Sequence, residues 1–267
     1  ISTLDMRVPM NIMKLNMPIT PRQGILITVI IGRWTKSAEP VSSKWLENQG
    51  FFNLKSATIR AEMNNLEEKG YLSHFHTSGG RIPTDKAYRY YVDNLIENEN
   101  LDPKPELKNK IKSAIKLNVK DPRLINRAVA QVLSELSDNL IIAGIAEEDD
   151  FFKIGLSSLF ELPDFREFDK MFRLTSFFDE FESIFGSIER DFFGVPSYDP
   201  QDVIIFIGKE NPVKDIRDET VMFAKYDLPE GHSGNLTLVG PTRMDYQKNI
   251  GLIKYATNEL NKLARNS

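Results

Sequence analysis

The sequence contains no cysteine among its 267 residues and only three histidines. Without cysteine the protein can have no disulfide, no thiolate zinc site, no iron–sulfur cluster and no cysteine nucleophile, which is compatible with a cytoplasmic location. This length allows one large domain or two ordinary ones, each able to bury a core without metal or disulfide staples. Thiol chemistry is therefore excluded, and a globular protein is expected.

Long hydrophobic runs are also absent. The longest, residues 25–31, includes one threonine and is far shorter than the roughly 18 to 20 residues that a membrane helix needs. Residues 1–17 lack the charged start, apolar stretch and small-residue cleavage site of a signal peptide. We therefore expect no membrane contact, and we interpret residues 1–19 as a flexible leader.

Neither sign of charge dominates the chain, which carries 34 Lys and Arg against 38 Asp and Glu. The two ends differ: residues 1–93 carry 12 basic and 8 acidic residues, a net charge of +4, whereas residues 94–267 carry 22 and 30, a net charge of −8. The basic end is suited to a polyanion such as DNA. Because so small an excess is also an ordinary fluctuation, motifs have to decide between a nucleic-acid partner and none.

Helix-capping residues mark the first ordered elements. A helix is predicted over residues 20–36, opened by the capping box Thr-Pro-Arg-Gln. A short helix is expected at residues 44–48, and a third helix over residues 56–69 with Ser56 as its N-cap. Two extended segments around a glycine turn then predict a hairpin, and a fourth helix follows Thr84.

Beyond a polar, proline-bearing stretch the pattern changes and is typical of a second domain. Two amphipathic helices are predicted, then four short β-branched strands, with a phenylalanine-rich helical stretch between the first two strands and a final helix after the last. Strands mixed with flanking helices predict an α+β fold. The predicted strands are 140–146, 203–208, 220–226 and 235–239, and the last two helices are 165–188 and 246–264.

Three helices followed by a two-stranded hairpin are typical of a winged helix-turn-helix, in which the third helix enters the DNA major groove. If Ile59, Met63 and Leu66 point inward, a rotation of about 100° per residue turns a second set of side chains outward. An outward arginine can bind guanine through two hydrogen bonds and an outward asparagine can bind adenine, while alanines allow close approach. The outward residues are Ala57, Thr58, Arg60, Ala61 and Asn64.

Phosphate contacts are expected from hydroxyl and basic residues around the third helix and from the hairpin, whose glycines let the backbone approach DNA closely. For any single residue, helix capping or turn formation explains the residue type equally well, so only the combination favours DNA. Glu67 and Glu68 repel phosphates, so the first half of the helix is predicted to enter the groove. The phosphate-binding candidates are Ser42, Ser43, Lys44, Lys55, Ser56, His74, His76, Thr77, Ser78, Gly79, Gly80 and Arg81.

No residue pattern supports catalysis or a metal site. His74 and His76 share one face of the predicted strand but have no third ligand nearby in sequence, so a solvated or phosphate-facing pair is preferred. The stretch 231–234, Gly-His-Ser-Gly, lacks the spacing of a hydrolase nucleophile and is predicted to form a turn between two strands. There is no nucleotide-binding glycine motif. We therefore predict no enzyme activity, no cofactor and no metal.

Blocks of the sequence in both halves match signatures of a known family. They are Glu39–Val41, Ala57–Arg60, Asn65–Glu67, the run HFHTSGGRIPTDKAYRYY at 74–91, Gly155–Leu159 and Val239–Tyr246. These blocks resemble the HrcA family of heat-inducible transcription repressors. The resemblance implies a cytoplasmic homodimer that represses chaperone genes at an inverted-repeat operator of double-stranded DNA, and whose activity is supported by the chaperonin.

The resemblance also implies how the chain is divided. Residues 20–96 are assigned to a winged-helix DNA-binding domain, 97–105 to a linker, and 106–267 to a GAF-like regulatory and dimerisation domain. Within the first domain, Ala61 stands where the family usually has asparagine, and Gly80 stands where it usually has alanine. These departures are expected to change base preference and the rigidity of the wing.

The second domain has a larger departure. The short stretch between Ala146 and Phe151 leaves out the inserted dimerisation subdomain that family members usually carry. An inverted repeat still requires two recognition helices related by a twofold axis. We therefore expect dimerisation through the helices of residues 107–136 or through the shortened sheet.

Two other functions stay open at this point. One is a winged-helix regulator whose GAF-like domain senses a small ligand, since such folds often hold one in a pocket. The other is a protein-interaction module that has lost DNA binding, which the net negative charge and the missing insert favour. Thermal-shift screening and the salt dependence of DNA binding discriminate between these alternatives and the repressor.

Overall fold

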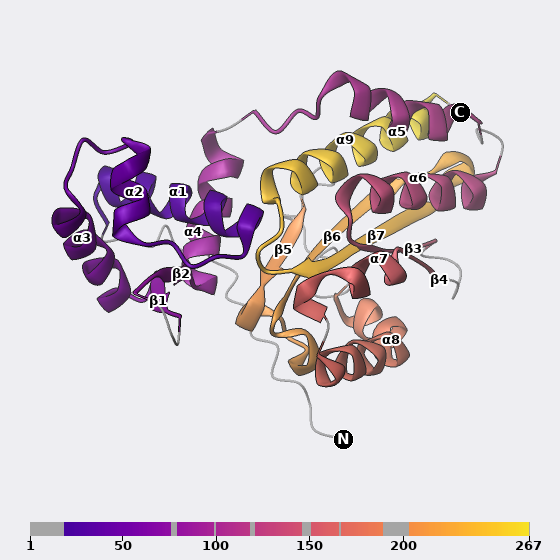
Figure 1. Cartoon of the computed structure of the whole chain (residues 1–267). Coiled ribbons are helices and arrows are strands. Elements are labelled where there is room, and N and C mark those ends of the chain that lie inside the picture. Colours follow the sequence, from indigo (N-terminus) through magenta and orange to yellow (C-terminus); the bar gives the residue numbers. More distant parts are fainter. Residues whose placement is uncertain are drawn as a thin grey trace. The chain divides into compact units, whose positions relative to one another are not determined.

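The computed structural model describes residues 19–75, 79–98, 100–117, 121–145, 151–165, 167–188 and 203–266. The chain forms two compact units, Ile1–Asp93 and Asn94–Ser267. Figure 1 shows the elements of both units, coloured along the sequence. Among the described residues, none of the helices is both long enough and apolar enough to cross a membrane.

The first unit contains three helices, then a two-stranded antiparallel hairpin and the start of a fourth helix. The predicted capping box is present: the Thr20 hydroxyl accepts from the Gln23 backbone N–H, and the Gln23 side chain accepts from the Thr20 N–H. Ser42 caps the second helix, and Gly50 ends it in a left-handed conformation. The elements are α1 (Pro21–Ser37), α2 (Ser43–Gln49), α3 (Ser56–Glu68), β1 (Leu72–His74), β2 (Arg81–Pro83) and α4 (Asp85–Asn98).

The start of α3 differs from the prediction. Lys55 is the N-cap, and Ser56 is the first helical residue. The Ser56 hydroxyl lies 2.9 Å from the Ser43 hydroxyl, and the Ser56 backbone N–H donates to the Glu47 carboxylate. The first backbone N–H of α3 therefore finds an acceptor on α2. The helix ends one residue before the predicted position.

The second unit has the predicted α+β fold, with a five-stranded antiparallel sheet of order β4-β3-β7-β6-β5. Sequence patterns missed β4 and α7, because four and six residues are too few to show a period. The elements are α5 (Pro105–Leu117), α6 (Pro122–Ser137), β3 (Leu140–Ile145), β4 (Phe151–Ile154), α7 (Leu156–Glu161), α8 (Phe168–Ile188), β5 (Ile204–Ile207), β6 (Glu219–Asp227), β7 (Ser233–Pro241) and α9 (Tyr246–Arg265).

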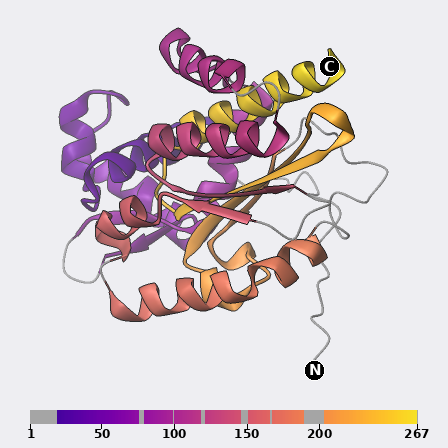
Figure 2. The same ribbon diagram turned by 90° about the vertical axis from the view of Figure 1, so that its right-hand side faces the viewer.

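Helices cover both faces of this sheet, with α6 and α9 on one face and α8 on the other (Figure 2). In the register of the strands, Ile142 lies opposite Thr237, which lies opposite Phe223. Residues opposite one another share a face, and their neighbours in sequence point to the other face. The row with Ile142 therefore faces α8, while residues such as Leu238 face α6 and α9.

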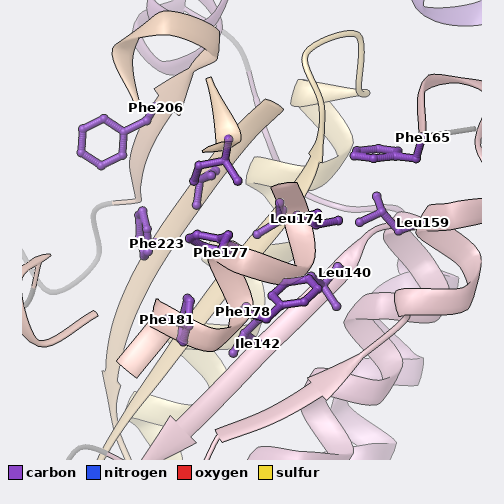
Figure 3. Packing of buried hydrophobic residues seen from close by; sticks show 13 residues of the cluster. Leu140, Ile142, Leu159, Phe165, Leu174, Phe177, Phe178, Phe181, Phe206 and Phe223 are labelled. Atoms are coloured by element: carbon purple, nitrogen blue, oxygen red, sulfur yellow. The ribbon is translucent and has the colours of Figure 1, made fainter. Parts of the chain in front are cut away.

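The core beneath α8 is rich in phenylalanine, as Figure 3 shows. The rings of Phe177 and Phe181 meet edge to face with centroids 5.5 Å apart, and those of Phe206 and Phe223 do so at 5.9 Å. Edge-to-face aromatic pairs contribute about 0.5 to 1.5 kcal/mol beyond the burial of their area. The phenylalanine-rich stretch singled out in the sequence therefore packs α8 onto the sheet.

Glu219, at the start of β6, is a buried carboxylate. It is 3% exposed, and within the described part of the chain its Oε2 has no hydrogen-bond partner and its Oε1 lies 3.7 Å from the Lys170 ammonium. Burial raises the pKa of Glu219 above its ordinary value, and the Lys170 ammonium opposes this only in part. The folded state thus disfavours the ionised carboxylate more than the unfolded chain does.

The Glu219→Gln variant is expected to be more stable than the wild type at pH 7. Because the pKa of Glu219 is raised in the folded state, the wild type loses stability as the pH rises through that pKa and the buried carboxyl ionises. The amide of the variant cannot ionise, so the variant avoids this loss. Thermal melts of the variant from pH 4 to pH 8 should show its advantage growing with pH. The control Asp218→Asn removes a carboxylate that is 60% exposed. A loss of stability for Glu219→Gln that is the same at every pH would contradict a raised pKa for Glu219.

Candidate nucleic-acid interface

One face of α3 is turned to solvent, as its periodicity predicts. Ile59, Met63 and Leu66 are each at most 2% exposed and fix the inward side of the helix. The opposite side carries small residues, one arginine and one asparagine, whose types suit base edges. All five of these residues are exposed: Ala57, Thr58, Arg60, Ala61 and Asn64.

A groove of about 560 Å³ lies beside this face, between α3 and the β1–β2 hairpin. Arg60 borders it and has no hydrogen-bond or ion-pair partner in the part of the chain that the structure describes. An unpaired, exposed guanidinium keeps all five donors for an external acceptor. The groove is lined by Arg60, Asn64, Glu67, Glu68, His74, Gly79 and Arg81.

Glu67 joins α3 to the hairpin. One of its carboxylate oxygens accepts from Arg81 Nε at 2.9 Å, and the other is hydrogen-bonded to His74 Nδ1. Arg81 also donates from Nη2 to Asn64 Oδ1 at 2.8 Å. These contacts hold the second half of α3 against both strands of the hairpin.

The same contacts change the roles expected for two residues. Arg81, predicted to bind phosphate, is only 6% exposed, and its guanidinium is bonded within the first unit. A buried cation requires such acceptors because leaving its charge unpaired is costly. Glu67, predicted to repel phosphates, has that cation as its partner. The sequence did not reveal the pair because 14 residues separate its members.

The two serines predicted at α2 differ in accessibility. The Ser42 hydroxyl accepts from the Trp45 backbone N–H at 3.1 Å, so this residue caps the helix at a partly exposed position. Ser43 is 4% exposed, and its hydroxyl is bonded to Ser56. The interpretation of Ser43 as a phosphate ligand therefore conflicts with its burial, because its side chain packs between α2 and α3.

The two lysines predicted to contact phosphate are exposed and share an acidic neighbour that sequence reasoning missed. Lys44 Nζ lies 2.9 Å from Glu47 Oε2, and Lys55 Nζ lies 3.8 Å from Glu47 Oε1. The hydrogen bond from Lys44, with the charges of both lysines, lowers the pKa of the Glu47 carboxyl. Glu47 is therefore ionised at neutral pH and offsets part of the positive charge at this end of α3.

Part of the predicted hairpin tip, namely His76, Thr77 and Ser78, lies outside the described residues. Gly79 lines the groove, and Gly80 packs closely against residue 40. A Cβ at Gly80 would lie 2.8 Å from Pro40 Cβ and 3.0 Å from its carbonyl carbon. The absence of a Cβ at Gly80 thus allows this close approach of the hairpin.

The residue patterns that resembled catalytic or metal sites have structural roles. His74 is bonded to Glu67, and the described residues bring together no group of three or more potential metal ligands. The turn predicted at 231–234 is confirmed for Gly231 and His232, which lie between β6 and β7, where the Leu228 N–H donates to the His232 carbonyl. Ser233 and Gly234 instead begin β7 and pair with β6.

The family model described as the HrcA protein C terminal domain matches residues 91–250. The chain belongs to the HrcA family. The heat-inducible transcription repressor HrcA of Lachnoclostridium phytofermentans is 26% identical over 89% of this chain and 95% of that protein. The repressor of the same name from Thermoanaerobacter pseudethanolicus is 26% identical over 92% and 97%. The family resemblance seen in the sequence is confirmed, and these relatives are named as transcription repressors.

This HrcA chain is shorter than those relatives. Its alignment with the Lachnoclostridium repressor spans 332 positions, whereas the chain has 267 residues, so at least 65 residues of the relative have no counterpart here. The described fold also resembles a crystal structure of a hypothetical protein, with a TM-score of 0.77, 17% identity, and coverage of 93% of this chain and 99% of that one. That likeness supports the α+β fold.

Proposed function

We propose that this HrcA chain is a sequence-specific DNA-binding transcription repressor of heat-shock genes, acting at an inverted-repeat operator upstream of chaperone genes. The observation that carries the proposal is the outward face of α3, where Arg60 and Asn64 stand exposed among alanines beside the hairpin. Arginine, asparagine and small residues on one helix face are suited to the major groove. The names of the relatives support the same function.

The proposal divides the contacts between two sets of residues. Bases are read by Ala57, Thr58, Arg60, Ala61 and Asn64 on the first half of α3. Phosphates are bound around the N-termini of α2 and α3 and by the hairpin, where exposed cations and backbone N–H groups are available. The phosphate-binding residues are Ser42, Lys44, Lys55, Ser56, His74, His76, Thr77, Ser78, Gly79 and Gly80.

The proposed architecture is a winged helix at residues 20–96, a linker at 97–105 and a GAF-like domain at 106–267. The order of α1, α2, α3 and the hairpin supports the first assignment. The five-stranded antiparallel sheet between helices supports the second. An inverted repeat requires a homodimer, and without the usual insert we assign dimerisation to α5, α6 or the sheet. The chaperonin is the proposed regulatory partner in the cytoplasm.

Selection from a pool of randomised duplexes tests this function. The wild-type protein should enrich one short sequence repeated in inverted orientation, with half-sites about one or two helical turns apart. The protein with Asn64→Ala and Arg60→Ala together is the control and should enrich nothing. Absence of enrichment by the wild type would refute sequence-specific binding.

Glu47→Gln is expected to raise affinity for every duplex, specific or not, by roughly two- to tenfold at low salt. The change releases Lys44 and Lys55 from their shared acidic neighbour and adds one unit of positive charge. Titrations at several salt concentrations should give a steeper slope than the wild type. Glu106→Gln is the matched control, because it removes the same charge from an exposed carboxylate in the first turn of α5, outside the unit that carries the proposed interface. An unchanged affinity for Glu47→Gln would show that neither lysine faces DNA.

A second candidate function is the sensing of a small polar ligand by the second unit. The Oδ1 and Nδ2 atoms of Asn235 and the hydroxyl of Thr237 are buried and have no hydrogen-bond partner among the described residues, on the face of β7 toward α8. Unpaired buried polar atoms are costly unless a ligand or water satisfies them. A thermal-shift screen of polar metabolites, repeated on Thr237→Val, tests for a ligand. No stabilisation of the wild type by any compound would count against it.

A further inference from the structure

Arg81 is held in place through both its backbone and its side chain. Its backbone N–H and carbonyl exchange hydrogen bonds of 2.9 Å with those of Val41, and it lies opposite His74 in the hairpin. The side chain is 8% exposed and donates to Glu67 and Asn64. The guanidinium is therefore a fixed part of the first unit, positioned behind the outward face of α3.

This fixed cation restricts the orientation of the Asn64 amide. A guanidinium has five donors and no acceptor, so it can face the oxygen of an amide but not its NH₂ group. In the structure Arg81 Nη2 donates to Asn64 Oδ1 at 2.8 Å, and Asn64 Nδ2 has no partner among the described residues. A rotation of the amide by 180° would place two sets of donors against each other, whereas an isolated asparagine could adopt either orientation.

We propose that Arg81 is a positioning residue that fixes the Asn64 amide with its Nδ2 donor outward, so that Asn64 recognises a base that presents a hydrogen-bond acceptor. In the major groove these acceptors are purine N7, guanine O6 and thymine O4, whereas cytosine presents the N4 donor. Asn64 accordingly selects against cytosine on the strand whose base it contacts, at one position of each half-site. The inference rests on the proposed DNA-binding function and adds a determinant of its specificity.

The first test converts the donor into an acceptor. Asn64→Asp keeps the size of the side chain and its partner Arg81, but it presents only oxygens. Anisotropy titrations use the duplex that the wild type selects and its variants at each base pair of the half-site. The wild type should bind the cytosine variant of one position at least about tenfold more weakly than the selected base. In Asn64→Asp, the ratio of the affinities for the selected base and for cytosine should fall to about one or be reversed, at that position alone.

The second test asks whether Arg81 acts through Asn64. Arg81→Met keeps an unbranched side chain that can fill much of the same space but removes the guanidinium donors, and Asn64→Ala removes the amide. Each variant should reduce discrimination between bases at the same base pair by about tenfold. The double variant should lose no more of this discrimination than either single variant. Arg60 is proposed to read another base pair. Combining Arg60→Ala with either variant should therefore multiply their separate losses of affinity for the selected duplex.

The outcomes separate this inference from the proposed function. Specific binding by the wild type, with discrimination unchanged in Asn64→Asp, would overturn the role of Asn64 and leave the repressor intact. Arg81→Met could instead weaken the binding of all duplexes equally, and its loss of affinity could multiply with that of Asn64→Ala in the double variant. That result would assign Arg81 to phosphate binding or to hairpin stability alone. Equal binding of all duplexes by the wild type would refute the proposed function and this inference together. Circular dichroism melts establish that each variant is folded.

Discussion

Arg60→Ala is expected to weaken binding to the selected inverted repeat by about 1 to 3 kcal/mol per half-site, roughly 5- to 150-fold. Arg60 is exposed on α3 and has no hydrogen-bond or ion-pair partner among the described residues, so its loss should remove the proposed contact with DNA and break no such bond within that part of the protein. The thermal stability should stay close to that of the wild type. Titration of the wild type and the variant with the same labelled duplex measures the effect.

The pattern across sequences distinguishes base reading from phosphate binding by Arg60. The variant should lose preference at one base pair of each half-site, while its affinity for scrambled duplex changes little. Lys44→Gln is the matched control, because Lys44 is an exposed cation on α2 and is proposed to bind phosphate. It should weaken all duplexes alike and reduce the salt slope by about one. The same uniform loss for Arg60→Ala would contradict its base-reading role.

Gly155→Ala is expected to destabilise the second unit by roughly 2 to 5 kcal/mol. Gly155 is the N-cap of α7 and has a φ of +92°, a conformation that favours glycine. A Cβ there would also lie 2.7 Å from the Asn139 carbonyl oxygen and would collide with the Ser134 hydroxyl. That hydroxyl is bonded to the carbonyls of Asn139 and Ile154, which join α6 to β3 and β4. Urea unfolding measures the loss.

Gly231→Ala separates the steric part of this effect from the backbone part. Gly231 has a φ of +79° in the turn before β7, but a Cβ there meets no atom within 4 Å. The control should therefore lose only about 1 kcal/mol, the cost of a left-handed backbone. If both variants lost the same amount, the close packing of Gly155 against α6 would not matter for stability.

Elements with a long period or a capping motif could be predicted from the sequence. The inward face of α3 followed from Ile59, Met63 and Leu66, because burial of three residues at helical spacing fixes the orientation of all the others. The capping box at Thr20 is likewise local, since every atom that it needs lies within four residues. The family blocks then extended the prediction to the function.

Features that depend on contacts between distant elements could not be predicted. Arg81 and Glu67 pair across 14 residues of sequence, and their pairing places a predicted phosphate ligand inside the unit. Glu47, on α2, accepts a hydrogen bond from the first backbone N–H of α3. Ser56, which was expected to cap that helix, bonds through its hydroxyl to Ser43 instead. Capping and charge pairing are both decided by which acceptor lies nearest in the fold.

The central claim is that two copies of α3 read an inverted repeat, and fluorescence anisotropy tests it most directly. The labelled duplexes are the selected repeat, the same duplex with one half-site scrambled, and a duplex with both scrambled, at one salt concentration near physiological strength. The account predicts tight binding to the intact repeat and much weaker binding to both scrambled duplexes, since a dimer needs both half-sites. Equal, weak and salt-sensitive binding to all three would contradict it.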